Sequence, residues 1–209
     1  VEHPVTECIT GLDLVEQMIL VAAGQKLTFE QGDVARDGWA MEARIYAEDP
    51  VRGFLPSIGR LTRYRVPEEK DGVRIDSGVE EGSEVTMFYD PMIAKLVVHG
   101  EDRASAIAAM RRALDGFEVR GVRHNIDFLS AIMREERFEE GALTAAFVEE
   151  TWPDGFSGAE CGPREETVLT GVALLAHLTV LARDRGITGT LDGAAMLPDT
   201  WVIRFADSK

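Results

Sequence analysis

The hydrophobic pattern of the chain is clearest over residues 38–49, "GWAMEARIYAED", where apolar and polar residues alternate. One side of this stretch would carry Trp39, Met41, Ala43 and Ile45, and the other Ala40, Glu42, Arg44 and Tyr46. A period of two residues predicts a β-strand with one polar face. Short strands are also expected after a Pro-Ser turn in 54–67, in the Gly-rich stretch 72–85, and in 90–100, where a turn precedes a buried strand.

Helical spacing appears in several other segments. Residues 10–24 place Leu14, Met18 and Val21 on one side, with Thr10 or Asp13 as the N-cap and Gly24 as the stop. Further helices are predicted over 101–114, 125–138 and 143–151. The helix at 101–114 has acidic residues in its first turn and arginines near its end, which the helix dipole favours.

The periodicity stops at "TWPDGFSGAECGP", residues 151–163, where turn-forming residues cluster and a domain boundary is predicted. A long apolar helix is expected over 164–185, followed by one strand over 199–209. Apolar residues surround most of this helix, so it should be buried on more than one side. Its length of roughly 20 residues would suffice to cross a bilayer, but Arg, Glu and His interrupt it, so burial against protein is the preferred interpretation.

Composition narrows the class of protein. A hydrophobic content of 45% allows a real core, and the formal net charge of -15 disfavours nucleic acid and anionic membrane as partners. Cys8 and Cys161 have no metal or redox spacing, which fits a reducing compartment. The sequence contains no Walker or dinucleotide loop, no zinc spacing and no nucleophile elbow. From composition alone, the chain would be a soluble α+β domain.

Several residues have both a functional and a structural interpretation. Glu2 and His3 could act as general acid and base, or be solvated residues before a turn. Arg44, in the middle of a strand, needs a partner, and an ordinary ion pair with Glu42 would supply one. Asp90 is either a functional carboxylate or the start of a Pro-assisted turn.

Two further residues have a structural interpretation as the default. Lys95, within an apolar strand, would be a residue at the edge of the sheet whose stem is buried. His177, within the apolar helix, would be a satisfied core histidine.

Four motifs in this order, "VEHPVTE..TG.DLV", "EARIYAEDP...FLPS.G", "FYDPMIAKL" and "G...N..FL..I", resemble the biotin carboxylase family, which carboxylates biotin with ATP and bicarbonate. The resemblance covers about residues 1–150. It implies an α+β fold in which an antiparallel sheet with flanking helices forms the biotin carboxylase C-terminal domain. In the family, "VEHPVTE" continues a segment that carries metal- and bicarbonate-binding residues. The resemblance therefore implies that this chain is the C-terminal part of such an enzyme, with most of the ATP-grasp core, and the ligands of ATP and Mg²⁺, elsewhere.

The resemblance also implies roles for individual residues. Glu2 matches the base that deprotonates bicarbonate, and the backbone of Val1 matches a bicarbonate contact. Arg44 matches the arginine that binds bicarbonate and stabilises the biotin enolate, and Asp90 matches an aspartate near the ureido ring of biotin. Arg74 resembles a position at the dimer interface of some members. No metal ligand is expected in this chain.

The remainder of the chain resembles the α subunits of acyl-CoA carboxylases, propionyl-CoA carboxylase among them. Residues 1–37 would end an ATP-grasp region, 38–157 would form the C-terminal carboxylase domain, and 158–209 would be a long helix and the start of a β-barrel-type domain. Expected partners are a biotin carboxyl carrier domain and a carboxyltransferase β subunit, in the cytoplasm or, in a eukaryote, the mitochondrial matrix. The alternative is a non-catalytic module for subunit assembly, with an exposed apolar surface on residues 164–185.

Overall fold

The computed structural model describes residues 3–158, 162–185 and 200–202. The chain divides into two compact units, Val1–Ala159 and Glu160–Lys209.

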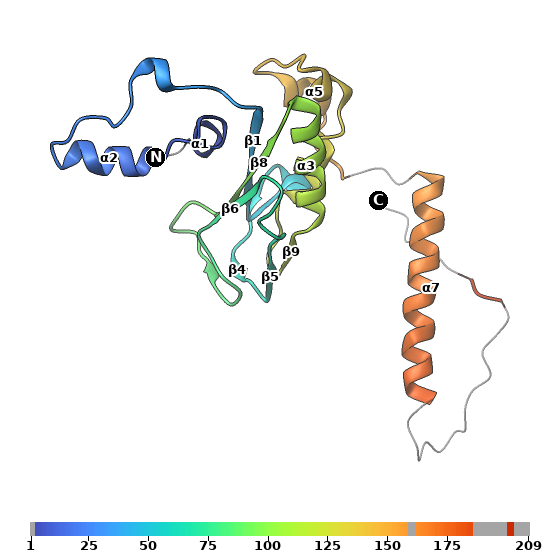
Figure 1. Ribbon diagram of the computed structural model, residues 1–209. Coiled ribbons are helices and arrows are strands. Elements are labelled where there is room, and N and C mark those ends of the chain that lie inside the picture. Colours follow the sequence, from blue (N-terminus) through green and yellow to red (C-terminus); the bar gives the residue numbers. More distant parts are fainter. Residues whose placement is uncertain (1–2, 159–161, 186–199, 203–209) are drawn as a thin grey trace. The chain divides into compact units, whose positions relative to one another are not determined.

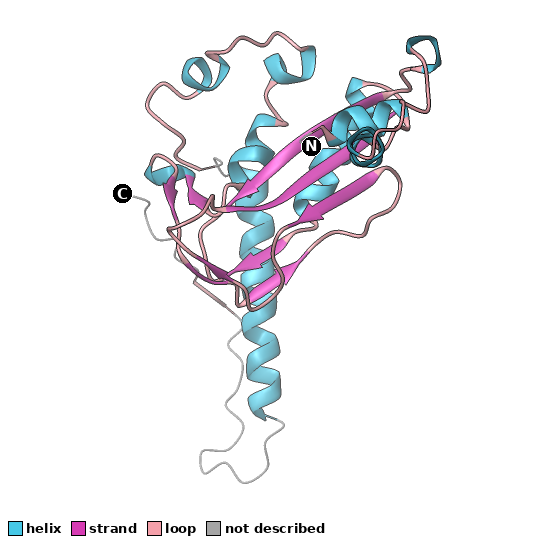
Figure 2. Cartoon of the chain, turned by 90° about the vertical axis from the view of Figure 1, so that its left-hand side faces the viewer, coloured by secondary structure: helices cyan, strands magenta, loops and turns pink. Residues whose placement is uncertain are grey.

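A three-stranded antiparallel sheet in the order β1-β8-β6 organises the first unit (Figures 1 and 2). Its strands are β1 (Trp39–Tyr46), β8 (Met92–Gly100) and β6 (Val73–Ser77). The strand predicted from the alternation over 38–49 is therefore confirmed. β8 lies between the other two, so the prediction that Lys95 sits at a sheet edge is wrong.

Three separate two-stranded sheets accompany this sheet. They pair β2 (Glu48–Asp49) with β3 (Leu55–Pro56), β4 (Gly59–Arg60) with β7 (Glu84–Val85), and β5 (Arg63–Arg65) with β9 (Glu118–Arg120). The 3-10 turns η1 (Gln31–Asp33) and η2 (Pro50–Arg52) lie in the loops. Strands β5 and β9 are 55 or so positions apart in sequence, and no local pattern predicted that they would pair.

Helix α3 (Arg103–Asp115) covers the apolar face of the sheet (Figure 1). Its N-cap Asp102 and Ser105 form a capping box, which satisfies free N–H groups of the first turn. The core between helix and sheet contains Ala43, Ile45, Leu96, Val98, Ala106, Ile107, Met110 and Leu114. The helix predicted over 101–114 is thus confirmed, and its buried side matches the inward residues of β1.

Helices α1 (Pro4–Thr10) and α2 (Leu14–Ala22) precede the sheet. The Asp13 side chain accepts a hydrogen bond from Glu16 N at 2.8 Å and so caps α2, while Thr10 ends α1. Of the two predicted caps, Asp13 is the one used. Helix α1 was not predicted, because its seven residues are too few for a clear helical period.

The predicted helix over 125–138 is two helices, α4 (Ile126–Ile132) and α5 (Glu136–Glu140). The break falls at Met133, whose carbonyl accepts hydrogen bonds from the guanidinium of Arg111 on α3. A carbonyl at a helix end needs such a partner, and here it comes from a distant element. The single-helix prediction was therefore wrong for a tertiary reason.

Helix α6 (Phe147–Thr151) and the segment after it close the first unit through aromatic packing. The Phe128 ring on α4 contacts Phe54, Trp152 and Phe156, with ring centroids 4.9, 5.2 and 5.3 Å away. This cluster anchors the chain up to Phe156, just before the predicted boundary.

In the second unit, α7 (Pro163–Arg185) agrees with the helix predicted over 164–185. None of its described side chains is buried, so burial on more than one side, as predicted, is not found here. By length and composition alone, α7 could cross a membrane.

Two further predictions concern this unit. His177 is exposed and packs edge-on against Trp201, with ring centroids 5.1 Å apart, so it is not a core histidine. The described part of the strand predicted over 199–209, residues 200–202, has no regular secondary structure, and the rest lies outside the described residues.

Candidate functional site

The face of the sheet opposite α3 carries charged residues in register. Arg44 lies directly across from Lys95, and Lys95 lies across from Asp76. In the next row, Glu42 is paired with Val97, and Val97 with Arg74. Directly paired residues of an antiparallel sheet point to the same side, so these two rows form one polar face.

Arg44 forms an ion pair with Glu42, with its Nε 2.9 Å from Glu42 Oε1. The Arg44 side chain is 42% exposed, whereas that of Glu42 is 15% exposed. The ion pair expected as the structural interpretation of Arg44 is therefore confirmed. Because a half-exposed pair contributes little to stability, its main effect is to orient the guanidinium against a fixed carboxylate.

The backbone of Arg44 is held by Asn125, a buried polar residue with 6% exposure. Asn125 Nδ2 donates to Arg44 O at 3.0 Å, and Asn125 Oδ1 accepts from Tyr46 N at 2.9 Å. The main-chain N–H of Asn125 also donates to Tyr46 O at 3.2 Å. These bonds fix β1 where its pairing with β8 shifts, between Ile45 and Tyr46.

Asp90 occupies an exposed turn that leads into β8. Its Oδ1 accepts a hydrogen bond from Met92 N at 2.9 Å, so the structural interpretation of a Pro-containing turn is confirmed. Met92 is the partner of Tyr46, which places this turn at the Arg44 end of β1. Burial raises the pKa of Glu48, and the negative charge of nearby Asp90 raises it further.

Val1 and Glu2 lie outside the described residues. The described chain begins at His3, the residue before α1. Helix α1 lies on the polar face, where Glu7 contacts Arg74 on β6 and Val97 of β8 is completely buried. The structure thus brings Arg44 and Asp90 to one end of the sheet, with α1 on the same face as Arg44.

Sequence reasoning missed Asn125, Glu48 and the contact between Glu7 and Arg74. Asn125 belongs to one of the motifs that carry the family resemblance, but its bonds to β1 span about 80 residues. Only a predicted pairing between the segment before α4 and β1 could have identified it.

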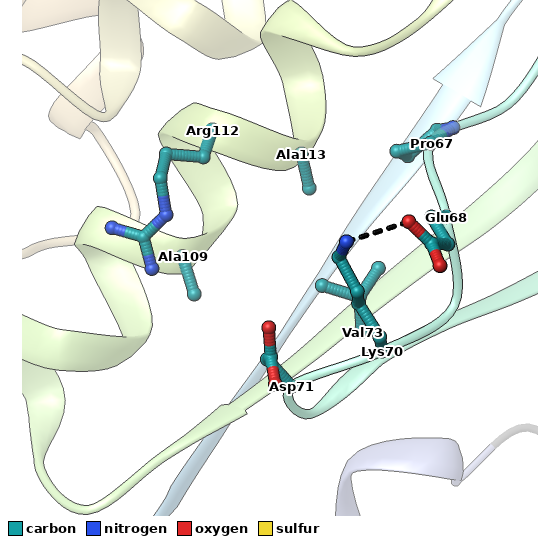
Figure 3. A pocket seen from close by; sticks show the side chains of 8 residues that line it. All are labelled: Pro67, Glu68, Lys70, Asp71, Val73, Ala109, Arg112 and Ala113. Carbon is teal, nitrogen blue, oxygen red and sulfur yellow. Dashed lines mark ion pairs between the residues drawn. The ribbon is translucent and has the colours of Figure 1, made fainter.

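Grooves occur elsewhere on the first unit. One of about 240 Å³ lies between the loop before β6 and α3 (Figure 3). It is lined by Pro67, Glu68, Lys70, Asp71, Val73, Ala109, Arg112 and Ala113. Lys70 Nζ is paired with Glu68 at 2.6 Å, and both side chains are exposed. This groove lies on the side of α3 and contains no predicted site residue.

A magnesium site is not offered by the described part of the chain. There, no group of three or more His, Cys, Asp or Glu side chains is placed to hold a metal ion.

Two family models match adjacent parts of the chain. The biotin carboxylase C-terminal domain matches residues 42–150, and the ATP binding domain of the carbamoyl-phosphate synthase L chain matches residues 1–30.

The curated relatives agree with these matches. The propionyl-CoA carboxylase alpha chain of Ruegeria pomeroyi is 48% identical, covering 97% of this chain and 33% of that protein. Biotin carboxylase 2 of Bacillus subtilis is 49% identical, covering 72% of this chain and 33% of that protein. The chain thus spans about a third of the length of these relatives.

Among solved structures, the biotin carboxylase domain of Hydrogenobacter thermophilus 2-oxoglutarate carboxylase is similar in fold. The TM-score is 0.72 at 43% identity, covering 77% of this chain and 35% of that one. That structure contains MgADP and bicarbonate.

Proposed function

The chain belongs to the biotin carboxylase family through its C-terminal domain, and from this premise we propose that it contributes to the carboxylation of biotin by ATP and bicarbonate. The observation that carries the proposal is the polar face of the sheet. There, Arg44 is oriented by Glu42, its backbone is held by Asn125, and Asp90 lies at the same end.

In this proposal, Arg44 binds bicarbonate and later stabilises charge on biotin. A guanidinium presents a planar fork that can hold a planar anion with two hydrogen bonds. The same group can stabilise the negative charge that develops on the ureido oxygen when biotin loses its N–H proton. A lysine lacks this fork, which distinguishes the two cations.

Glu2, Val1 and Asp90 have the remaining proposed roles. The Glu2 carboxylate accepts the proton of bicarbonate, which otherwise is a poor nucleophile toward the γ-phosphate of ATP. The backbone of Val1 contacts bicarbonate, and Asp90 lies beside the ureido ring. ATP supplies the phosphoryl group, and its ligands, with those of Mg²⁺, belong to other parts of the ATP-binding domain.

The proposed assembly is an acyl-CoA carboxylase, with propionyl-CoA the favoured substrate class because of the Ruegeria relative. Residues 1–37 would end the ATP-binding region, 38–157 form the C-terminal domain, and 158–209 begin a barrel-type domain. The partners would be a biotin carboxyl carrier domain and a carboxyltransferase β subunit, in the cytoplasm or the mitochondrial matrix.

A second candidate function is subunit assembly. It is favoured by α7, where Val168, Leu169, Val172, Leu175 and Val180 are all exposed. The two functions are compatible in one protein, because they use different units of the chain.

A hybrid chain tests the catalytic proposal. In it, the matching third of the Ruegeria pomeroyi propionyl-CoA carboxylase alpha chain is replaced by this chain. With free biotin, the hybrid should release phosphate from ATP in a bicarbonate-dependent way, whereas the present chain alone should not. A folded hybrid without this activity, or turnover by the present chain alone, would contradict the proposal.

A further inference from the structure

The guanidinium of Arg74 joins two segments that match different families. Its Nη1 donates to Glu7 Oε2 at 2.7 Å. Its Nε and Nη2 donate to the two carboxylate oxygens of Asp76 at 2.8 and 2.9 Å. Glu7 lies in the segment matched by the ATP-binding domain, and Arg74 and Asp76 lie in the biotin carboxylase C-terminal domain.

Glu7 extends this connection to α2. Its second oxygen, Oε1, accepts a hydrogen bond from Leu14 N, the first residue of α2, at 2.9 Å. The Glu7 side chain is only 15% exposed. One carboxylate from α1 therefore contacts both the start of α2 and strand β6.

Asp76 extends the connection across the sheet. It lies opposite Lys95, which lies opposite Arg44. Arg74 itself is in the row of Val97 and Glu42, and Glu42 is the partner of Arg44. Asp76 thus lies in the same row as Arg44, and Arg74 lies in the next row on the same face.

We propose that Arg74 is a positioning residue that holds α1 against the sheet face that carries Arg44. This inference rests on the proposed function, in which the base and the anion-binding arginine come from the two segments. Three hydrogen bonds of the Arg74 guanidinium are made within the chain, so this positioning role needs no second copy of the protein.

Energetics separate a positioning role from a stabilising one. The Arg74 side chain is 41% exposed, and an ion pair with that exposure contributes little to global stability. The geometry of reacting groups is far more sensitive, since a misplacement of about 1 Å can cost roughly a hundredfold in rate. The expected signature is a large loss of turnover with a small shift in Tm.

The first measurement is hydrogen exchange on the present chain. Arg74→Gln should raise the exchange of amides in residues 4–14 at least about fivefold and leave β8 and α3 unchanged, with Tm lowered by no more than about 4 °C. Arg63→Gln is the matched control. Arg63 is 35% exposed and pairs with Glu118 at 3.3 Å, wholly within the C-terminal domain. Unchanged exchange in 4–14 for Arg74→Gln would overturn the proposal.

The second measurement is turnover in the hybrid chain. Arg74→Gln should lower kcat for bicarbonate-dependent ATP cleavage about tenfold or more, without changing KM for ATP. Arg74→Lys should restore only part of this loss, because a lysine cannot bond Asp76 and Glu7 in the same fork. The double variant Glu7→Gln with Arg74→Gln should lower kcat no further than Arg74→Gln alone. Both changes break the same contact, the one between Glu7 and Arg74.

The outcomes distinguish the two proposals. An inactive wild-type hybrid contradicts the proposed function. Hydrogen exchange in residues 4–14 then remains as the test of whether Arg74 holds α1. An active hybrid in which Arg74→Gln and Arg63→Gln have equal kcat overturns the positioning role and leaves the proposed function intact.

Discussion

The side-chain amide of Asn125 donates a hydrogen bond to the main-chain carbonyl of Arg44 at 3.0 Å, across 81 positions of sequence. The same side chain accepts from Tyr46 N, so a buried amide completes the hydrogen bonding of β1 beside Arg44. Buried polar groups are stabilising only when they are paired in this way.

Asn125→Asp should therefore destabilise the first unit. The aspartate keeps the acceptor for Tyr46 N but replaces the donor with an oxygen that faces the carbonyl of Arg44. The free energy of unfolding should fall by about 2–3 kcal/mol, measured by urea denaturation.

Gln17→Glu is the control for this prediction. Gln17 is also buried, and its side-chain oxygen accepts from Thr28. This change buries a carboxylate but does not bring its oxygen against a second acceptor, as Asn125→Asp does against the carbonyl of Arg44. The free energy of unfolding should therefore fall less than for Asn125→Asp. Equal losses for the two variants would contradict the role given to the Asn125 donor.

Arg44→Ala should slow biotin carboxylation in the hybrid chain by about a hundredfold, or ~3 kcal/mol, because the enolate loses its stabilising charge. KM for ATP should stay unchanged. Initial rates of bicarbonate-dependent phosphate release with free biotin, taken over a series of ATP concentrations, measure both kcat and KM for ATP. Arg120→Ala serves as a control, since Arg120 is 72% exposed and pairs with Glu118 at 3.1 Å. A matching rise in KM for ATP would instead indicate general damage to the fold.

His124 should make stability depend on pH. Burial lowers the pKa of its imidazole, although the charge of Asp127 opposes the effect. Since the folded pKa lies below the unfolded value of about 6.5, the unfolded chain takes up the proton first as pH falls. Stability should thus be complete above about pH 7 and fall below pH 6.5, by at most about 1.4 kcal/mol per pH unit.

Unfolding curves at several pH values between 5 and 7.5 test this expectation. His124→Gln should flatten the dependence, and His3→Gln, a change at an exposed imidazole, is the matched control. A slope that is the same in the His124→Gln variant and the wild type would contradict the assignment to His124.

The exposed apolar surface of α7 should make the chain self-associate. Light scattering over a concentration series should show species larger than a monomer, and a hydrophobic dye should bind. Val172→Glu with Leu175→Glu should weaken both signals. Val51→Glu changes an equally exposed residue of the first unit and should leave both the scattering and the dye signal unchanged. A strictly monomeric wild-type chain that binds no dye would remove the main support for the assembly function.

The sequence by itself determined those elements whose signals are local. Alternation over eight residues predicted β1, and a cap with a regular apolar period predicted α2. Charges that the helix dipole favours predicted α3, and a long apolar stretch predicted α7. Such patterns are reliable because each depends only on residues within a few positions. The ion pair of Arg44 with Glu42 was also accessible, since residues two apart on a strand share a face. The family came from motifs rather than from any physical pattern.

The tertiary structure decided what depends on distant partners. At the split between α4 and α5, the carbonyl of Met133 accepts a hydrogen bond from Arg111 of the distant helix α3. The central place of β8, and hence of Lys95, follows from strand order, which hydrophobic alternation does not encode. The contacts of Asn125 with β1 and of Arg74 with Glu7 span 67 to 81 positions. Hydrogen-bond geometry at such separations exists only after the chain has folded, because no local preference brings those groups together.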